Sequence, residues 1–343
     1  MHSASLPPDG SAPSPHAPSA APVRRAVFSG PGECRVETAE LPLPLPGEVR
    51  VRARLSLISP GTELALLHRT HPGFEIPGFG WARYPFWPGY SLVGSAETEG
   101  ESIAAGARVF ARAPHATRSN VARAAVFGLP DMVSDEQAAF LGLAKIAWTA
   151  VLQAPPRPGE HVVVVGLGLV GNLAAQLMRL AGAEVVGTDL SAARREIGRA
   201  CGIEVAEPDA FEPFRDPVDL RPAGRPTLVV DAVGSAATID TCLNLVAPRG
   251  RVVLLGAPRS PVTVDAYLQI MRKGVAWIGA HEMHGEGEAV PATIERLIGA
   301  LGAGSLRVEP LIRGTFPLEE AGAAYAALGS DPEGPPGVFL DLR

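Results

Sequence analysis

Short stretches of alternating apolar and polar residues fill the first half of the chain from Val23 onward. RRAVFSG, CRVETAE, EVRVRARLSLI and ARVFARAPHATRSNVA alternate or run apolar, with turn residues between them. A period of two is typical of strands with one buried face. The pattern therefore predicts a β-rich region over residues 23–147.

A helical pattern closes this region. Residues 134–154 read SDEQAAFLGLAKIAWTAVLQA, with apolar residues at helical spacing. Ser134 as N-cap and Gln137 three residues later have the form of a capping box. Lys145 is one charge in an otherwise apolar helix. A buried lysine would have a lowered pKa and could protonate a product, whereas an exposed one would only face solvent. Both interpretations stay open.

Apolar strands with helical spacers dominate the next part of the chain. HVVVVGLGLVG, EVVGTDL, TLVVDAVG, RGRVVLLGA and GVAWIGA are each short and rich in valine or leucine. Strands that alternate with helices argue for parallel βαβ units whose sheet is covered on both faces. We therefore predict an α/β domain over residues 148–278.

The two ends of the chain differ from each other. Residues 1–22 are rich in Pro, Ser and Ala, cannot bury a core, and are expected to form a disordered tail. Residues 279–343 carry an amphipathic helix, AVPATIERLIGALGAG, followed by a strand, a helix and the final strand GVFLDLR. The C-terminal segment is therefore predicted to be folded.

Composition narrows the possible partners. The chain has 343 residues, enough for two domains, and is 46% hydrophobic and 19% charged. A net charge of -6 favours neither nucleic acid nor an anionic membrane as partner. The three cysteines have no metal-type spacing and exclude a disulfide framework. A cytoplasmic protein that acts on a small molecule is expected.

A glycine pattern follows the first valine strand. Gly166, Gly168 and Gly171 form G-x-G-x-x-G between a strand and a helix, which is the context that the dinucleotide fingerprint needs. The first glycine allows the tight turn, the second the approach of a pyrophosphate, and the third close packing of helix and strand. The free N–H groups of the helix N-terminus bind phosphate. A nucleotide cofactor is predicted here.

An acidic residue ends the second strand of this region. Asp189 comes about 20 residues after the glycines, where a carboxylate accepts hydrogen bonds from ribose hydroxyls and repels a 2′-phosphate. We therefore predict NAD(H) rather than NADP(H). Arg194 and Arg195 follow, either as solvated helix residues or with one of them beside the adenine. If one of them dominated, NADPH would be preferred.

These segments resemble the medium-chain dehydrogenase/reductase superfamily over residues 23–343. The resemblance rests on LPLPLPGEVRVRARLSLISPGTEL, WPGYSLVG, FLGLAKIAWTA, PGEHVVVVGLGLVG, VVDAVG, GRVVLLG and KGVAWIGA, which occur in the family's order. ISPGTEL and PFWPGYS are similar to the branch that includes bacteriochlorophyllide hydroxyethyl dehydrogenases. The narrower likeness rests on these two segments.

The resemblance implies an architecture and a set of contacts. Residues 23–147 and 279–343 would form a GroES-like β-barrel catalytic domain, and residues 148–278 an inserted Rossmann domain with a doubly wound parallel sheet. Members are usually homodimers or homotetramers. The further cofactor-binding residues that it implies are Leu169, Val170, Val233, Leu255, Gly256 and Ile278.

The family's zinc ligands are replaced in this sequence. The positions that carry them in zinc members read Pro60, Tyr90, Ser91 and Leu143, none of which is a good zinc ligand. The structural zinc lobe would need four clustered cysteines, which are absent after GARVFARAP. We expect no zinc. The alternative is a misalignment in which some of five histidines converge on a metal: His68, His71, His115, His281 and His284.

Other side chains must then stabilise the oxyanion and deliver a proton. Thr62 matches the family's proton-relay hydroxyl, or else only satisfies a turn. Tyr90, at a former ligand position, is a candidate acid or oxyanion donor, or a packing tyrosine. Ser59 and Ser91 would be small polar lining, and Glu63 matches a supporting acid. His115 and His281 either reach the pocket or lie elsewhere.

Residues 72–88 are dense in aromatic side chains, glycine and proline. They either pack against each other or form a substrate wall for a bulky molecule. We favour a zinc-independent, NAD-dependent enzyme that interconverts a secondary alcohol and a ketone on a cyclitol, sugar or natural-product intermediate. The alternatives are an enoyl or quinone reductase, and a nucleotide-binding protein or non-redox enzyme of the same fold.

Overall fold

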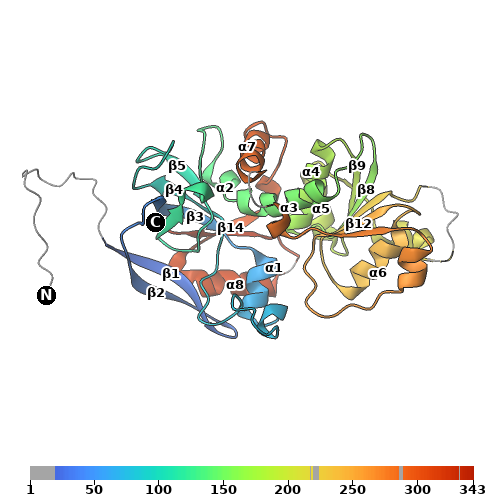
Figure 1. Ribbon diagram of the computed structural model, residues 1–343, viewed down its shortest axis with the longest axis horizontal. Coiled ribbons are helices and arrows are strands. Elements are labelled where there is room, and N and C mark those ends of the chain that lie inside the picture. Colours follow the sequence, from blue (N-terminus) through green and yellow to red (C-terminus); the bar gives the residue numbers. More distant parts are fainter. Residues whose placement is uncertain (1–19, 217, 219–223, 286–288, 332) are drawn as a thin grey trace, which may run out of the picture.

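Two sheet systems lie side by side along the long axis of the molecule (Figure 1). The computed structural model describes residues 20–216, 218, 224–285, 289–331 and 333–343. One lobe is β-rich, and the other is built on a parallel sheet. The predicted α/β class is confirmed, with a GroES-like catalytic unit and an inserted Rossmann sheet.

The catalytic lobe joins the two ends of the chain in one seven-stranded sheet. Its strand order is β14 (Ile312–Pro317), β15 (Gly337–Asp341), β3 (Glu48–Leu57), β4 (Leu92–Ala96), β5 (Arg108–Ala111) and β7 (Val126–Gly128), with β6 (Arg118–Ala122) paired to β3. A separate antiparallel pair consists of β1 (Ala21–Gly30) and β2 (Glu33–Leu41). The helices of this lobe are α1 (Pro60–Leu67), α2 (Asp135–Ala138), α3 (Leu141–Gln153), α7 (Ala289–Gly302) and α8 (Ala321–Ser330).

The Rossmann lobe contains six strands that all run parallel. Their order is β10 (Glu204–Val205), β9 (Glu184–Thr188), β8 (His161–Val165), β11 (Leu228–Asp231), β12 (Arg251–Leu254) and β13 (Ala276–Gly279). The helices α4 (Leu169–Leu180), α5 (Ala192–Ala200) and α6 (Ala236–Leu245) connect them. Strand order reverses at β8, so the crevice beyond the carboxyl ends of β8 and β11 is the expected ligand site.

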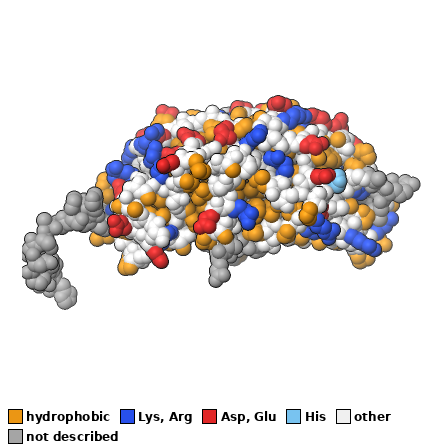
Figure 2. Space-filling model, turned by 90° about the horizontal axis from the view of Figure 1, so that it is seen from above, with side chains coloured by type: hydrophobic (Ala, Val, Ile, Leu, Met, Phe, Trp, Pro, Cys, Tyr) orange, Lys and Arg blue, Asp and Glu red, His pale blue; other side chains and the backbone are white. Residues whose placement is uncertain are grey.

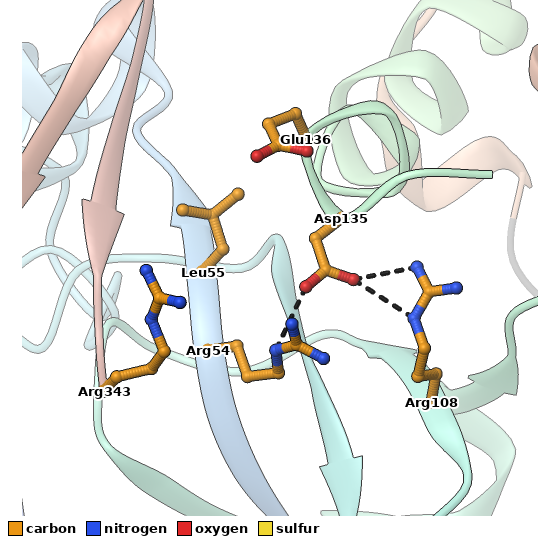
Figure 3. A pocket seen from close by; sticks show the side chains of 6 residues that line it. All are labelled: Arg54, Leu55, Arg108, Asp135, Glu136 and Arg343. Carbon is orange, nitrogen blue, oxygen red and sulfur yellow. Dashed lines mark hydrogen bonds and ion pairs between the residues drawn. The ribbon is translucent and has the colours of Figure 1, made fainter. Parts of the chain in front are cut away.

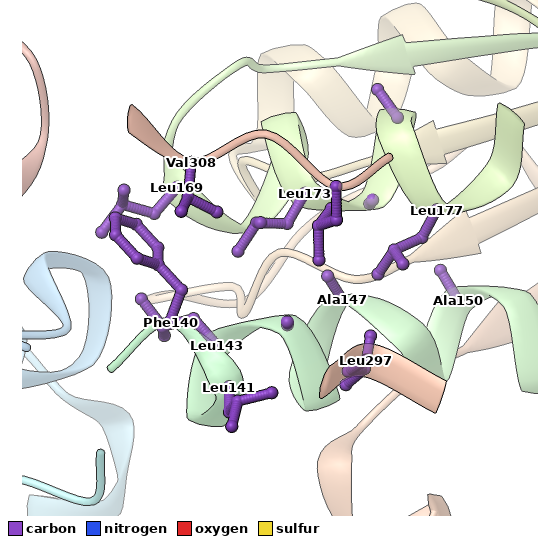
Figure 4. Packing of buried hydrophobic residues seen from close by; sticks show 14 of the residues in the cluster. Phe140, Leu141, Leu143, Ala147, Ala150, Leu169, Leu173, Leu177, Leu297 and Val308 are labelled. Atoms are coloured by element: carbon purple, nitrogen blue, oxygen red, sulfur yellow. The ribbon is translucent and has the colours of Figure 1, made fainter. Parts of the chain in front are cut away.

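A shared core packs α3 of the catalytic lobe against α4 of the Rossmann lobe. Ala147 and Ala150 of α3 face Leu173 and Leu177 of α4, and Leu297 of α7 packs on the same cluster (Figure 4). The small alanine side chains allow the two helix backbones to approach closely. The predicted domain boundary at residue 147 falls inside α3. The boundaries near residues 147 and 279 therefore stay predictions.

The structure corrects two predicted boundaries of secondary-structure elements. The helix expected over residues 134–154 is divided into α2 and α3, although the capping box of Ser134 and Gln137 is present. Strand β1 begins at Ala21, inside the segment expected to be a tail, because Ala21 and Pro22 pair with Leu41 and Glu40. The rest of that tail, residues 1–19, lies outside the described residues.

Charged side chains of both signs are spread over the surface. One face mixes Lys and Arg with Asp and Glu side chains over both lobes (Figure 2). Within the described ranges, no helix has both the length and the apolar character needed to cross a bilayer.

Candidate active site

The glycine loop between β8 and α4 has the geometry of a phosphate cradle. Gly166 has a φ of +93°, and a Cβ there would lie 2.4 Å from Val233 Cγ2. A Cβ on Gly171 would lie 1.8 Å from the carbonyl oxygen of Gly166. Gly168 is the N-cap of α4, so Leu169 and Val170 begin that helix. A larger residue at Gly166 or Gly171 would force this turn to move, and the turn leaves the first N–H groups of α4 for a ligand.

Asp189 stands at the carboxyl end of β9, beside this loop. Its Oδ2 accepts a hydrogen bond of 2.7 Å from Leu167 N, and its Oδ1 accepts one of 2.9 Å from Ser191 N. The carboxylate is therefore fixed between the glycine turn and the start of α5. The dinucleotide fingerprint places the ribose acid at this point.

The two arginines that follow have different surroundings. Arg195 is buried, donates 2.7 Å to the carbonyl oxygen of Asp189, and pairs with Glu207. Arg194 extends toward the phosphate end, where its Nη1 lies 3.2 Å from the position of a Cβ on Gly168. Arg195 is thus a structural residue, and Arg194 is the arginine near the cradle.

A buried acid at the end of β11 holds the loops that follow β11 and β12. Asp231 is fully buried, and its Oδ1 accepts hydrogen bonds of 3.0 Å from Val233 N and 3.1 Å from Gly234 N. Its carbonyl oxygen accepts 2.9 and 2.8 Å bonds from the backbone N–H groups of Leu255 and Gly256. Ile278 pairs with Val253 at the sheet edge. The sequence interpretation missed Asp231, although an acid that ends the apolar run LVVD is a visible signal.

These residues fit a pyridine dinucleotide. The glycine cradle, the N-terminus of α4 and the acid after β9 are the three parts that such a cofactor requires. Gly166, Gly168 and Gly171 would hold its pyrophosphate, and Asp189 its ribose.

A chain of hydrogen bonds passes through Tyr90, one of the positions that the sequence matches to the family's zinc ligands. The Tyr90 hydroxyl donates to Ser59 Oγ, and Ser59 N donates to Glu63 Oε1 at 3.1 Å. Glu63 is 1% exposed, and Ser59 is the N-cap of α1. The first turn of α1 therefore holds Ser59 and Glu63 on one side of Tyr90.

Glu63 is also the centre of a buried cluster. Its Oε2 accepts hydrogen bonds from the Tyr325 hydroxyl and from His115 Nε2, the latter at 3.0 Å. His115 Nδ1 lies 2.7 Å from Ser56 Oγ, and the ring has no exposed surface. His115 does not reach the pocket as a free acid, because both ring nitrogens are engaged. Tyr325 comes from α8, far along the chain, and sequence reasoning missed it.

Charged side chains from three segments lie near Tyr90: Arg112 after β5, Lys145 on α3 and Glu282 after β13. Arg112 lies over the Tyr90 ring at 5.5 Å and forms a 2.6 Å ion pair with Glu282. Lys145 is buried, and its charge helps to lower the pKa of Glu282, which burial alone would raise and Arg112 lowers. Lys145 is thus the buried lysine of the two alternatives, and it faces an acid.

Burial raises the pKa of Tyr90 above its usual range, and the nearby negative charge of Glu63 adds to this effect. The hydrogen bond to Ser59 and the charge of Arg112 act in the opposite direction but are smaller. The phenol therefore stays protonated at neutral pH, as a hydrogen-bond donor must.

The four replaced positions do not form the donor set of a catalytic zinc. Pro60 has no donor atom, Leu143 is buried in the core, and Ser91 Oγ already donates to Ala139 O and accepts from Gly142 N. Among the described residues there is no group of three or more His, Cys, Asp or Glu arranged to hold a metal. His281 is exposed, and the side chain of His284 lies outside the described residues.

Two further candidates lie at the same corner. Thr62 is half-buried in the first turn of α1, where the part of the chain that the structure describes offers its hydroxyl no hydrogen-bond partner. In the loop 72–88, Phe79 and Trp81 are 42% and 48% exposed and contact His71. Trp81 also contacts Phe79 and Phe86, so the rings of this loop pack against one another and stay partly exposed.

A separate hollow of about 410 Å³ lies on the outer face of the catalytic lobe. Arg54 and Arg108 both reach the Asp135 carboxylate there, at 3.1 and 2.8 Å (Figure 3). Leu55, Glu136 and Arg343 complete the lining. It contains none of the residues described above, so it is not the candidate site.

Known proteins share this fold and, in part, this sequence. A family model described as zinc-binding dehydrogenase matches residues 170–298. The 2-desacetyl-2-hydroxyethyl bacteriochlorophyllide A dehydrogenase of Cereibacter sphaeroides is 30% identical over 331 residues, which cover 90% of this chain and 94% of that protein.

Solved structures agree with the fold. The galactitol-1-phosphate dehydrogenase of Escherichia coli is 20% identical, covers 93% of this chain and 99% of its own, and has a TM-score of 0.80. A zinc-binding dehydrogenase from Sinorhizobium meliloti, bound to NADP, is 23% identical, covers 94% and 99%, and has a TM-score of 0.75.

The glycine cradle and the two-lobed fold are those of the medium-chain dehydrogenases. The chain belongs to the medium-chain dehydrogenase/reductase family, whose members are oxidoreductases of the alcohol dehydrogenase type.

Proposed function

We propose that the protein is a zinc-independent, NAD(H)-dependent oxidoreductase that interconverts a secondary alcohol and a ketone on a medium-sized metabolite, such as a cyclitol, sugar or natural-product intermediate. The observation that carries this proposal is the Tyr90–Ser59–Glu63 chain at the position of the family's metal. We also expect a cytoplasmic homodimer or homotetramer. The name of the Cereibacter relative, which contains a hydroxyethyl group, supports an alcohol as one partner of the reaction.

Tyr90 would act at the oxygen of the substrate. When bound, the nicotinamide supplies or accepts the hydride. As charge develops on the carbonyl oxygen, the Tyr90 O–H bond breaks and its proton forms the new hydroxyl group. A phenol with a raised pKa still gives its proton to an alkoxide, because an alkoxide is the stronger base. The Ser59 hydroxyl and the positive charge of Arg112 would stabilise the phenolate.

NAD(H) is favoured over NADP(H) by the charges around the ribose corner. Asp189 is fixed there by two backbone hydrogen bonds, and the Ser191 hydroxyl next to it donates to Glu333 of the other lobe. Two carboxylates would thus face a 2′-phosphate. Of the two arginines that could oppose them, Arg195 is already paired with Glu207, and Arg194 lies toward the phosphate end, near Gly168.

Three measurements on the purified protein test the proposal. Calorimetric titration should give tight NADH and weak NADPH binding, and metal analysis should give well under one zinc per chain. With NADH, a panel of matched ketones and enones should show reduction of the ketones. One zinc per chain would overturn zinc independence, tighter NADPH would overturn the cofactor assignment, and reduction of enones alone would indicate an enoyl reductase. Binding without turnover over the whole panel would indicate a non-redox protein.

A further inference from the structure

One arginine of the Rossmann lobe contacts the catalytic lobe. Arg259 follows β12, and its Nη2 donates a 2.5 Å hydrogen bond to the carbonyl oxygen of Gly61 at the start of α1. The side chain is half-buried. Sequence reasoning missed it, because nothing in the stretch GAPRSPV marks a binding residue. The contact places a guanidinium beside the turn that carries Ser59 and Thr62.

Among the residues that the structure describes, no acid forms an ion pair with Arg259. Arg112 is paired with Glu282 and Arg195 with Glu207, but Arg259 has only a backbone carbonyl, and no carboxylate of the described residues lies within ion-pair distance. Burial lowers the pKa of this guanidinium, as expected for a cation that has lost water without gaining an anion. A half-buried cation of this kind is stabilised when a ligand brings the missing negative charge.

The residues around Arg259 are those of the proposed substrate site. Its charge interacts with Tyr90, the proposed proton donor, and with His71, whose ring contacts Phe79 and Trp81. The cofactor phosphates have a different place, at the N-terminus of α4, with Arg194 next to Gly168. The anion that Arg259 receives therefore belongs with the group that reacts at Tyr90.

We propose that Arg259 binds a carboxylate or phosphate of the substrate, so that the enzyme acts on an anionic secondary alcohol or ketone whose apolar body lies on the aromatic side chains of the loop 72–88. The planar fork of the guanidinium matches both anions and would orient the carbonyl group toward Tyr90. The inference rests on the proposed function, because that function places the substrate beside Tyr90.

Binding is tested without turnover. The protein saturated with NAD⁺ is titrated calorimetrically with 4-acetylbenzoate, 4-acetylphenyl phosphate and the neutral 4-acetylbenzamide. At least one anion should bind roughly tenfold or more tightly than the amide. Arg259→Gln should abolish the preference, Arg259→Lys should keep part of it, and Arg215→Gln, an exposed arginine of the same lobe paired with Glu212, should leave it unchanged.

The two proposals fail in different ways. Equal binding of anions and amide, or an unchanged preference in Arg259→Gln, would overturn the anion site. A loss of NADH affinity in Arg259→Gln as large as the loss of anion affinity would assign the arginine to the cofactor phosphates and also overturn it. If anion binding depends on Arg259 but NADH reduces neither anionic ketone, the anion site stands and the redox function falls.

Discussion

The glycine loop of the Rossmann lobe and the corner around Tyr90 in the catalytic lobe are held together differently. The loop is built from neighbouring residues, and backbone packing defines it, as in the 1.8 Å approach of a Gly171 Cβ to Gly166 O. The corner joins Ser56, Ser59 and Glu63 to Tyr90, His115 and Tyr325 through side-chain hydrogen bonds.

Under the proposed zinc-independent function, this difference would explain why the glycine loop keeps the family pattern and the Tyr90 corner does not. A steric requirement for glycine has no substitute, so the loop keeps the family pattern. A polar corner can exchange a metal for hydrogen bonds, provided that each buried group finds a partner. Glu63 meets that condition with three donors, from Ser59, His115 and Tyr325.

The largest effect is expected in the loop. Gly171→Ala should weaken NADH binding by more than about 100-fold, because the new methyl group cannot coexist with the Gly166 carbonyl unless the turn moves. Fluorescence titration with NADH measures this loss.

The matched control is Gly299→Ala in α7. A Cβ at Gly299 meets no atom within 4 Å, so this variant should bind NADH as the parent does and should not be less stable. Equal NADH affinity in both variants would show that the cradle is not where the cofactor binds.

Much of the fold was predictable because it depends on local pattern. The valine strands, the glycine turn and the capping box of Ser134 and Gln137 are each encoded within a few residues. The break between α2 and α3 was not predicted, because Ala139 and Phe140 carry the same helical pattern as their neighbours. Tertiary packing decides that break.

The candidate site was less accessible from sequence. Tyr90 and Ser59 were found through their positions in the family pattern, but their partners were not. Tyr325 and Arg259 are brought to the corner by packing between distant segments, and neither stands in a motif. His115 was expected near the pocket but is fully buried between Ser56 and Glu63. Only the fold decides which polar residue meets which.

The centre of the corner should give the next largest effect. Glu63→Gln should lower the free energy of unfolding by about 2 kcal/mol, because an amide nitrogen would replace one of the two oxygens that accept hydrogen bonds. Urea unfolding measures the change. Glu75→Gln, at an exposed ion pair with Arg69 on the same lobe, should change stability by less than about 0.5 kcal/mol. Equal changes in the free energy of unfolding of both variants would show that the Glu63 hydrogen bonds stabilise the protein no more than an exposed ion pair does.

Tyr90→Phe removes the hydroxyl group at the outer end of the Tyr90–Ser59–Glu63 hydrogen-bond chain. Turnover of the best ketone should fall at least about tenfold, while NADH affinity stays the same, because only the hydroxyl is lost. Unchanged turnover would remove Tyr90 as the proton donor.

The pH dependence of turnover in the parent enzyme also tests whether Tyr90 is the proton donor. The raised pKa of Tyr90 keeps the phenol protonated, so ketone reduction should vary little from about pH 6 to about pH 9. Alcohol oxidation needs the phenolate and should rise with pH over the same range. In Tyr90→Phe the rise in oxidation should disappear, and its persistence would assign the base to another group.

The smallest effect is expected where the catalytic lobe touches the ribose corner. Glu333 is exposed and accepts a hydrogen bond from Ser191, close to Asp189, so Glu333→Gln should remove part of the repulsion of a 2′-phosphate. The preference for NADH over NADPH should fall by about two- to fivefold, and less at high salt, as expected for exposed charges. Calorimetric titration with both cofactors measures the ratio, with Glu320→Gln as an exposed control on the same lobe. A parallel loss of NADH and NADPH affinity would show that Glu333 holds the lobes together without selecting the cofactor.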